Sequence, residues 1–403
     1  MRGTVMGGEA QATPVTTGSA RVPLRVIARE WGRIGCIGFG GPPAHIALLR
    51  RLCVTDRGWL SASDFEDGIA ATNLLPGPAS TQLSIFCAWR LRGALGGLVG
   101  GVCFIVPGLV LILGLSALFL TSHPPRAVQG AAAGAGAAVA AVALNAALGL
   151  VPASWRRAGA GRSPRSRWVL YALCGAAAAA TVGPFLVLVL LAAGLAEVAA
   201  RSSWPRSKPA LHSVAVLPLL VVTAVGGMGA LVWEALKVGA LSYGGGFVIV
   251  PLMQQDVVHV YHWMTGAQFL NAVALGQITP GPVVQTVAVV GYAAAGIGGG
   301  LLAALVAFAP SFAFVLLGGR YFDRLRTSPA VQAFLSGAGP AAIGAIAGSS
   351  IPLGLALTHL WQVGVLGAAL VWMLALRRNV VVGLVAAAVV GVAVSLFGIP
   401  VGA

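Results

Sequence analysis

The two halves of the sequence repeat one another in register, and this duplication constrains the fold more than any other feature. A shift of 204 positions carries the Phe-Gly-Gly of residues 39–41 onto the Tyr-Gly-Gly of residues 243–245. The same shift superimposes two Pro-Gly-Pro motifs, at residues 76–78 and 280–282. After a deletion of one residue the register continues at 203 positions. Chance does not maintain such a register, so the sequence indicates a duplicated structural unit.

Charged side chains are too scarce for a water-soluble protein of this length. The 403 residues include 25 lysines and arginines and 10 aspartates and glutamates, which make up 9% of the chain. Soluble proteins contain about 25% of such residues. Hydrophobic residues account for 58%. We therefore predict an all-α polytopic membrane protein, with the lipid bilayer as its surroundings.

The basic residues predict that the two units have opposite orientations in the membrane. The loops at Arg50–Arg57 and Arg90–Arg92 are basic, whereas the equivalent residues 254–263 and 293–298 contain no lysine or arginine. Cytoplasmic loops carry the excess of lysine and arginine. We therefore expect two inverted-topology repeats. The net charge of +15 then reflects this topology, and we expect no binding of nucleic acid.

Each unit begins with two apolar segments that are interrupted by proline and glycine. These segments are 24–49 and 64–90 in the first unit, and 230–253 and 267–294 in the second. Clusters of proline and glycine break a helix. Basic residues flank the first-unit segments on both sides, so each is expected to enter and leave the membrane on the same side. We predict two re-entrant or broken helical hairpins per unit, followed by about four transmembrane helices.

This pattern divides the chain into four parts. Residues 1–20 are polar and lack the apolar region of a signal peptide, so we expect a disordered tail and a cytoplasmic N-terminus. Residues 21–208 are expected to form transmembrane repeat 1. Residues 209–229 are expected to form one connecting transmembrane helix, whose single crossing inverts the second unit. Residues 230–403 are expected to form the inverted repeat 2.

The sequence lacks the motifs of several enzyme and cofactor classes. The two lysines, Lys208 and Lys237, do not follow glycine as a nucleotide-binding P-loop requires, so we expect no use of ATP. The five cysteines show no Cys-x-x-Cys spacing. The metal-binding and serine-hydrolase motifs of membrane enzymes are also absent. We expect no enzymatic activity, no cofactor and no metal, and we assign Asp256, His259 and His262 to a solvated loop.

The broken segments predict where a substrate binds. Irregular backbone at membrane depth occurs where it is buried in protein or lines a cavity, and broken helices in inverted repeats mark the substrate site of secondary transporters. A helix that restarts after a break offers unpaired N–H groups and a positive dipole end to an anion. The predicted substrate-binding residues at the breaks are Gly40, Gly41, Pro76, Gly77, Pro78, Ser80, Thr81, Gln82, Gly244, Gly245, Pro280, Gly281, Pro282, Gln285 and Thr286. The alternative is that Pro-Gly-Pro only kinks two spanning helices.

Charged residues recur at matching positions of the two units. Glu30 and Arg33 in the first unit correspond to Glu234 and Lys237 in the second, each pair on one helix face. Ionisable residues inside a membrane are costly and therefore indicate function. We assign Lys237 and Arg33 to binding of the anion, and Glu30 and Glu234 to charge compensation or coupling. The alternative for Arg33 is a juxtamembrane stripe shared with Arg29.

The motifs resemble those of one known family. The first half contains FGGPPAHIALLRR and NLLPGPASTQL, and the second contains SYGGGFVIVPLMQ and GQITPGPVVQTVAVVGY. Over residues 22–400 the chain resembles the long, two-domain form of the chromate ion transporter (CHR) family. The resemblance implies efflux of chromate, with sulfate as its chemical analogue, and chromate resistance in a bacterial inner membrane. Because ASTQ follows the first Pro-Gly-Pro and VVQ the second, the two hairpins differ in detail.

We therefore expect a secondary transporter that binds a tetrahedral oxyanion at the broken helices and exports it by alternating access. One alternative is a transporter of sulfate or another oxyanion, and a second is an anion channel that uses the same site. A third is a cation-coupled importer of small organic anions, in which Glu30, Asp67 or Glu234 would bind the cation. A homodimer is one candidate assembly.

Overall fold

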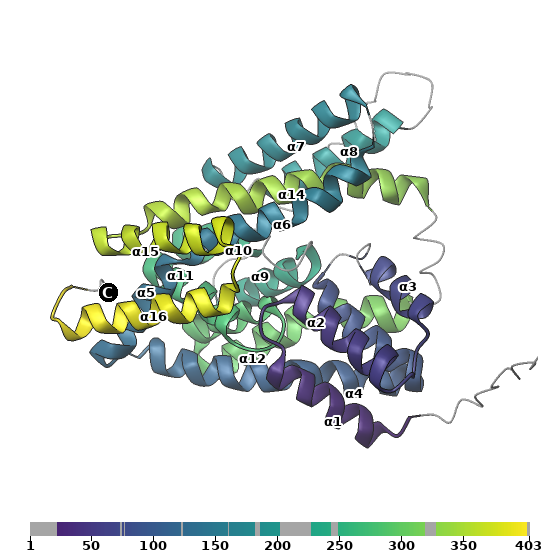
Figure 1. The fold of residues 1–403 in the computed structure, drawn as a ribbon, viewed down its shortest axis with the longest axis horizontal. Helices are drawn as coiled ribbons and strands as arrows, with labels where there is room; N and C mark the ends of the chain where they lie inside the picture. The colour runs from purple at the N-terminus through teal and green to yellow at the C-terminus, as the bar shows by residue number, and fades with distance from the viewer. Residues whose placement is uncertain are drawn as a thin grey trace, which may run out of the picture.

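The fold is known from a computed structural model, which describes residues 22–72, 75, 77–121, 124–159, 161–181, 186–201, 227–242, 249–318 and 328–400. Within these residues every regular element is a helix. The predicted tail at 1–20 and nearly all of the predicted connecting helix at 209–229 lie outside the described residues. Figure 1 shows the helices gathered into one body, with most of the long helices running along its longest axis.

The first half of the chain contains four elements that precede the long helices. They are α1 (Leu24–Ile37), α2 (Pro42–Arg50), the π-helical turn η1 (Arg51–Asp56) and α3 (Ala62–Thr72). The later helices of this half are α4 (Ala79–Phe119), α5 (Arg126–Ala137), α6 (Val139–Ala158), α7 (Arg162–Thr181) and α8 (Leu186–Arg201).

The second half begins with the same series of elements. They are α9 (Met228–Leu241), α10 (Ile249–Gln254), the π-helical turn η4 (Gln255–Val260) and α11 (Gly266–Ile278). The remaining elements are η5 (Val283–Gln285), α12 (Thr286–Gly318), α14 (Pro329–Leu355), α15 (Leu360–Leu370), η7 (Val371–Ala375) and α16 (Val380–Leu396). Helices α1 and α9 have the same length of 14 residues, and their bounds differ by the shift found in the sequence.

Helices α4 and α12 bend at corresponding positions, so the two halves also share a backbone conformation. In α4 the bend lies at Arg92 (φ −145°, ψ 19°) and Gly93 (φ 64°, ψ −155°). In α12 it lies at Ala295 (φ −154°, ψ 32°) and Gly296 (φ 64°, ψ −156°). Glycine occupies the second position in both because it adopts positive φ without steric cost. The repeated sequence is thus matched by a repeated local conformation.

Several helices are long and apolar enough to cross a membrane. The described residues contain four of them, which are Ala79–Phe119, Arg126–Ala158, Val283–Gly318 and Pro329–Leu355. Two shorter apolar helices span Leu360–Ala375 and Val380–Leu396. For the described part of the chain, the prediction of an all-α membrane protein is therefore confirmed.

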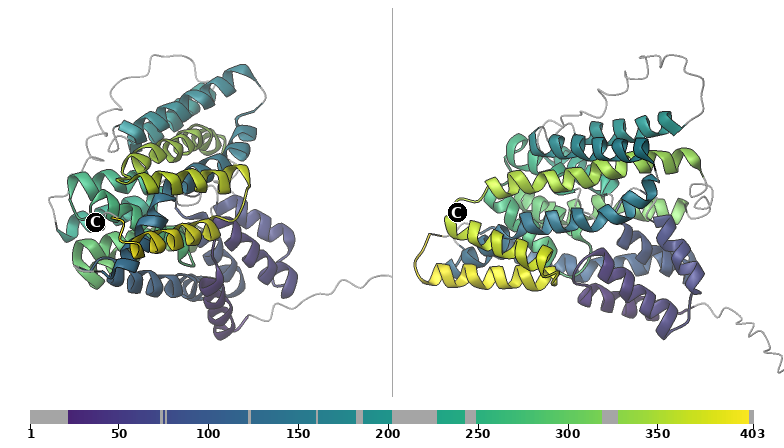
Figure 2. Two further views of the ribbon diagram at one scale, coloured as in Figure 1. Left: turned by 60° about the vertical axis from the view of Figure 1, so that its left-hand side comes forward. Right: turned by 45° about the horizontal axis from the view of Figure 1, so that its top comes forward.

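Small residues allow the long helices to approach closely. A methyl group at Gly344 of α14 would collide with the backbone of Ala172 in α7, and one at Gly130 of α5 would collide with the backbone of Gly391 in α16. Figures 1 and 2 show α7, α8 and α14 together on one side of the molecule and α5 beside α16. Such contacts between small residues are the usual means of helix association in membranes.

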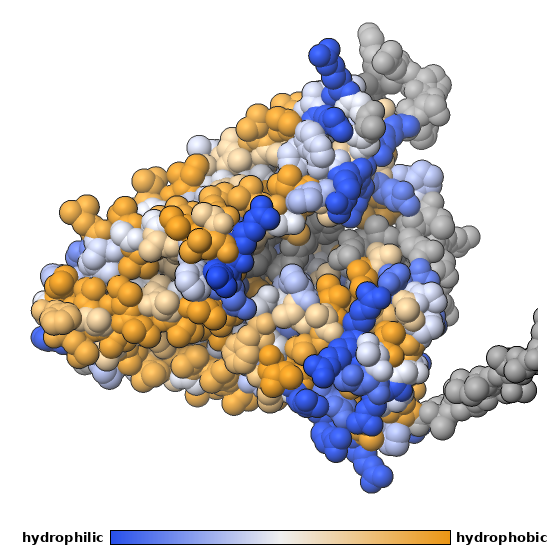
Figure 3. Space-filling model, viewed as in Figure 1, coloured by the Kyte–Doolittle hydropathy of each residue, from blue (hydrophilic) through white to orange (hydrophobic). Residues whose placement is uncertain are grey.

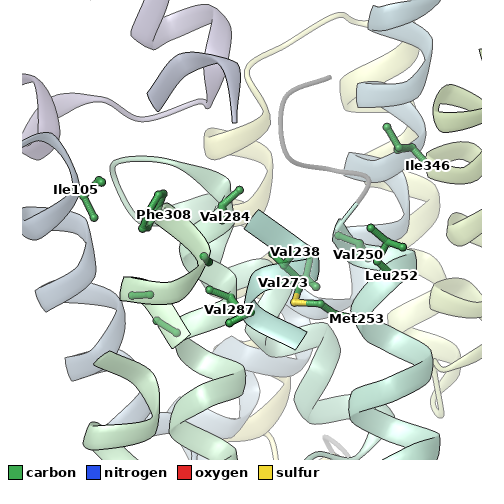
Figure 4. Packing of buried hydrophobic residues seen from close by; sticks show 14 of the residues in the cluster. Ile105, Val238, Val250, Leu252, Met253, Val273, Val284, Val287, Phe308 and Ile346 are labelled. Atoms are coloured by element: carbon green, nitrogen blue, oxygen red, sulfur yellow. The ribbon is translucent and has the colours of Figure 1, made fainter. Parts of the chain in front are cut away.

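The surface is apolar over most of its length and hydrophilic at one end. Figure 3 shows most of the hydrophilic residues at the end formed by α1, α3 and the start of α7, and a smaller hydrophilic patch near the middle of this face. Exposed arginines at this end include Arg29, Arg33, Arg50 and Arg165. In the interior, Val238 of α9, Met253 of α10 and Val273 of α11 lie close together, as Figure 4 shows. This packing joins the broken helices of the second half to one another.

Candidate functional site

The first interruption lies between α1 and α2. Helix α1 ends at Ile37, and Gly40 (φ +96°) and Gly41 (φ +73°) reverse the chain in a conformation that favours glycine. Helix α2 then begins with Pro42 at its first position, where a missing N–H group costs nothing. The corresponding Gly244 and Gly245 of the second half lie outside the described residues.

The two Pro-Gly-Pro motifs interrupt the backbone rather than merely bending a helix. Gly77 and Gly281 both have positive φ, +118° and +100°. The prolines after them, Pro78 and Pro282, are extended and directly precede the next helical turn. In the second half α11 ends at Ile278, four residues before Pro282. Pro76 of the first motif lies outside the described residues.

The interruptions of the two halves lie against each other. The backbone N–H of Gly281 donates a hydrogen bond to the carbonyl oxygen of Gly38, at 2.9 Å. A methyl group on Gly77 would lie 3.3 Å from the carbonyl oxygen of Gly239 and 3.4 Å from the Ser311 hydroxyl. One on Gly108 of α4 would collide with the carbonyl oxygen of Pro280. Segments far apart in sequence therefore meet at one place, which we call the tip region (residues 38–45, 77–84, 239–242, 277–286 and Ser311).

Neutral polar side chains are buried in the tip region. The predicted residues Ser80, Thr81, Gln82, Gln285 and Thr286 are each at most 2% exposed. The Gln285 side chain donates to the carbonyl oxygen of Ile105 at 2.7 Å, and the Thr286 hydroxyl donates to that of Val283 at 2.8 Å. The structure thus brings these predicted residues of both halves together in the protein interior.

Several buried polar atoms have no hydrogen-bond partner within the described residues. They are Thr81 Oγ1, Ser84 Oγ, Ser242 Oγ, Gln277 Nε2, Gln285 Oε1 and Ser311 Oγ. Buried polar groups are normally hydrogen-bonded, so a cluster of unpaired ones calls for a ligand or water. Apart from Thr81 and Gln285, these residues were missed by the sequence reasoning. The repeat register gave no signal for Ser242 and Ser311, because the corresponding Gly38 and Gly108 carry no polar side chain.

His45 is a further tip residue that the sequence reasoning missed. Its side chain is 0% exposed. Its Nε2 lies 2.8 Å from the carbonyl oxygen of Gly38, and its Nδ1 lies 3.2 Å from the Ser80 hydroxyl. The ring also meets Phe104 edge-on, with 5.1 Å between centroids. The imidazole therefore links the interruption between α1 and α2 to the start of α4, which follows the first Pro-Gly-Pro motif.

Arg33 lies at the surface rather than in the tip region. Its side chain is 72% exposed and 4.0 Å from Glu30. Glu30 is buried and accepts hydrogen bonds from Arg57 at 2.9 Å and Arg29 at 3.1 Å. The structure therefore groups Arg33 with the other arginines around Glu30, as in the juxtamembrane alternative.

Lys237 forms a buried charge cluster with two carboxylates. Its ammonium group lies 2.6 Å from Glu234, which is fully buried, and it also donates a hydrogen bond to Asp256. The expectation of a solvated loop at Asp256 is wrong, because this side chain is 20% exposed and contacts Lys237. The cluster places one ammonium group against two carboxyl groups, so Lys237 already has two partners among the protein's own residues.

These features define an all-helical, multi-pass membrane protein with neutral polar groups buried where its helices break. The comparison with known families specifies the class further. The family model described as "Chromate transporter" matches residues 26–198 and 229–392. The chain therefore belongs to the chromate transporter family, and the two matched stretches correspond to its two halves.

Named relatives cover most of the chain. The "Chromate transport protein" of Cupriavidus metallidurans is 33% identical over 87% of this chain and 86% of its own length. The "Probable chromate transport protein" of Synechococcus elongatus is 29% identical over 83% of this chain and 86% of its own length. The "Chromate transport protein" of Pseudomonas aeruginosa is 29% identical over 85% and 84%. No solved structure matches the chain.

Proposed function

We propose that the protein is a secondary transporter that exports chromate, or a sulfate-like oxyanion, across the bacterial inner membrane and so gives resistance to chromate. The observation that carries this proposal is the set of unpaired hydroxyl and amide groups buried at the meeting point of the broken helices. Family membership and the names of the relatives support the choice of chromate. The domain boundaries expected from the sequence, with two inverted repeats joined by one crossing, are part of the proposal.

The chemistry of the tip region suits a tetrahedral dianion. Hydroxyl and amide donors, such as Thr81 Oγ1 and Gln277 Nε2, can bind several oxygens at once, and burial strengthens each of these hydrogen bonds. The restarting helices α4 and α12 add the positive ends of their dipoles. This recognition requires neither a cofactor nor a metal.

The membrane potential favours export of such an anion. The arginine-rich end of the molecule in Figure 3 is proposed to face the cytoplasm, as the distribution of basic residues in membrane proteins requires. Moving two negative charges out of a cell with a negative interior releases about 4.6 kcal/mol per 100 mV. Export by alternating access therefore needs no ATP.

The proposed inversion predicts the membrane side of two matching loops. A reporter inserted after Arg57 is expected to be cytoplasmic, and one inserted after His262 in the equivalent loop is expected on the opposite side. The reason is that the first loop is basic and the second has no lysine or arginine. Location of both loops on one side would contradict the inverted repeat.

Exchange across a membrane separates a transporter from a channel. In proteoliposomes, uptake of labelled sulfate is expected to rise when unlabelled chromate is present inside, because an alternating carrier returns faster when loaded. Liposomes without protein and liposomes without internal chromate serve as controls. Saturable uptake without this stimulation would favour the anion channel, and absence of chromate transport would contradict the proposed function.

A further inference from the structure

His45 is a titratable side chain in the tip region, and the proposed function does not use it. It lies in the first turn of α2 and is completely buried. An exposed histidine changes its protonation state between about pH 5 and pH 8. Burial favours the neutral ring, whereas a bound dianion beside the ring favours the charged one. A buried histidine at a substrate site can therefore link protonation to binding.

The hydrogen-bond partners of His45 define the position of its proton. A carbonyl oxygen only accepts, so Nε2 carries a hydrogen and donates it to Gly38. In the neutral ring Nδ1 is then an acceptor, and the Ser80 hydroxyl must donate to it. In the protonated ring Nδ1 also carries a hydrogen, so Ser80 accepts and its own hydroxyl hydrogen is released for another acceptor.

The Ser80 hydroxyl, whose role changes on protonation of His45, lies next to an unpaired group of the tip region. Ser80 lies in the first turn of α4 and directly precedes Thr81, whose hydroxyl has no partner within the described residues. The carbonyl oxygen of Gly38 that accepts from His45 also accepts from the N–H of Gly281. The imidazole therefore lies at the hydrogen bond that joins the two halves.

The charged side chains on the elements packed around His45 are paired elsewhere or lie at the surface. Glu30 of α1 binds Arg29 and Arg57, Arg50 of α2 binds Glu66, and Arg90 of α4 binds Asp64. The other titratable groups on these elements are Arg25, Arg33 and Cys36 of α1 and Cys87, Arg92 and Cys103 of α4. No hydrogen bond joins His45 to a charged side chain in the described part of the chain. A proton on His45 therefore adds positive charge among neutral donors.

We propose that His45 is a proton-binding positioning residue, which on protonation turns the Ser80 hydroxyl into a donor for the oxyanion. The proton comes from solvent and is held on Nδ1, and no covalent bond other than this N–H forms. The oxyanion and the proton then bind together, and each increases the affinity for the other. This inference rests on the proposed function, because it assumes that the oxyanion binds in the tip region.

The test measures sulfate binding to the purified protein as a function of pH. Sulfate is the probe because it remains a dianion throughout, whereas chromate itself takes up a proton near neutral pH. We expect the affinity to rise about tenfold from about pH 8 to about pH 5.5, with uptake of protons from the buffer on binding. In His45→Gln, whose amide can still donate to Gly38, both the pH dependence and the proton uptake are expected to disappear.

Two further variants distinguish this coupling from a general loss of structure. Ser80→Ala is expected to reduce the pH dependence although His45 is intact, because only the charge of the protonated ring then acts on the anion. His259→Gln replaces an exposed histidine of the matching hairpin and is expected to leave the pH profile unchanged. An unchanged pH profile in His45→Gln would overturn the inference and leave the proposed function intact. Chromate transport without sulfate binding at any pH would also overturn the role proposed for His45. Absence of any oxyanion binding would contradict both this role and the proposed function.

Discussion

Replacement of Gln285 by glutamate is expected to reduce chromate transport at least about 100-fold. The substitution keeps the size of the side chain but places a carboxylate at a fully buried position in the tip region. Like charges in such surroundings cost several kcal/mol, and each 1.4 kcal/mol changes an affinity tenfold. The carboxylate also loses the donor that Gln285 offers to the carbonyl oxygen of Ile105. Initial rates of chromate uptake into proteoliposomes measure the effect.

A matched control makes the same chemical change at the opposite end of α11. Gln268 of α11 accepts a hydrogen bond from the backbone N–H of Thr265 through its side-chain oxygen, and glutamate serves equally well in this capping position. Gln268→Glu is therefore expected to transport chromate at nearly the normal rate. Normal transport by Gln285→Glu would place the oxyanion away from the tip region.

Replacement of Lys237 by methionine is expected to destabilise the protein by about 3–5 kcal/mol, the usual cost of leaving buried charges without their partner. In this variant Glu234 and Asp256 would face each other without a cation. The measurement is thermal unfolding of the purified protein together with its yield in the membrane. Transport is expected to fall with the amount of folded protein.

A triple variant separates stability from substrate binding at this position. Lys237→Met combined with Glu234→Gln and Asp256→Asn removes all three charges at nearly constant volume, and it is expected to recover most of the lost stability. If Lys237 serves only its two carboxylates, the triple variant transports chromate per folded molecule as the natural sequence does. A stable triple variant without transport would instead assign Lys237 to the anion.

The sequence predicted the membrane class and the positions of the breaks because both depend on local chemistry. Glycine and proline have few alternatives to a turn when they interrupt an apolar segment. The breaks were therefore predicted at Gly41, Gly77 and Gly281, and each of these residues has a positive φ. The repeat register also has a structural counterpart, since Gly93 and Gly296 share one conformation. Polar residues next to these breaks, such as Gln285, were found for the same reason.

Partners that come from distant segments could not be predicted in this way. The contact between Lys237 of α9 and Asp256 of η4 forms only when the chain between them folds back. The contact between His45 and Ser80 joins α2 to α4. Periodicity places a residue on a helix face but does not say which face of a neighbouring helix it meets. For this reason the sequence suggested an anion contact for Arg33, whereas the structure shows an exposed side chain beside Glu30.

Equilibrium binding of chromate to the purified protein tests the central claim most directly. We expect saturable binding that sulfate displaces, and we expect Thr81→Val in the first half and Gln285→Glu in the second half each to weaken it strongly. This result would mean that the breaks of both halves form one oxyanion site. Saturable chromate binding with the same affinity in both variants would contradict the account.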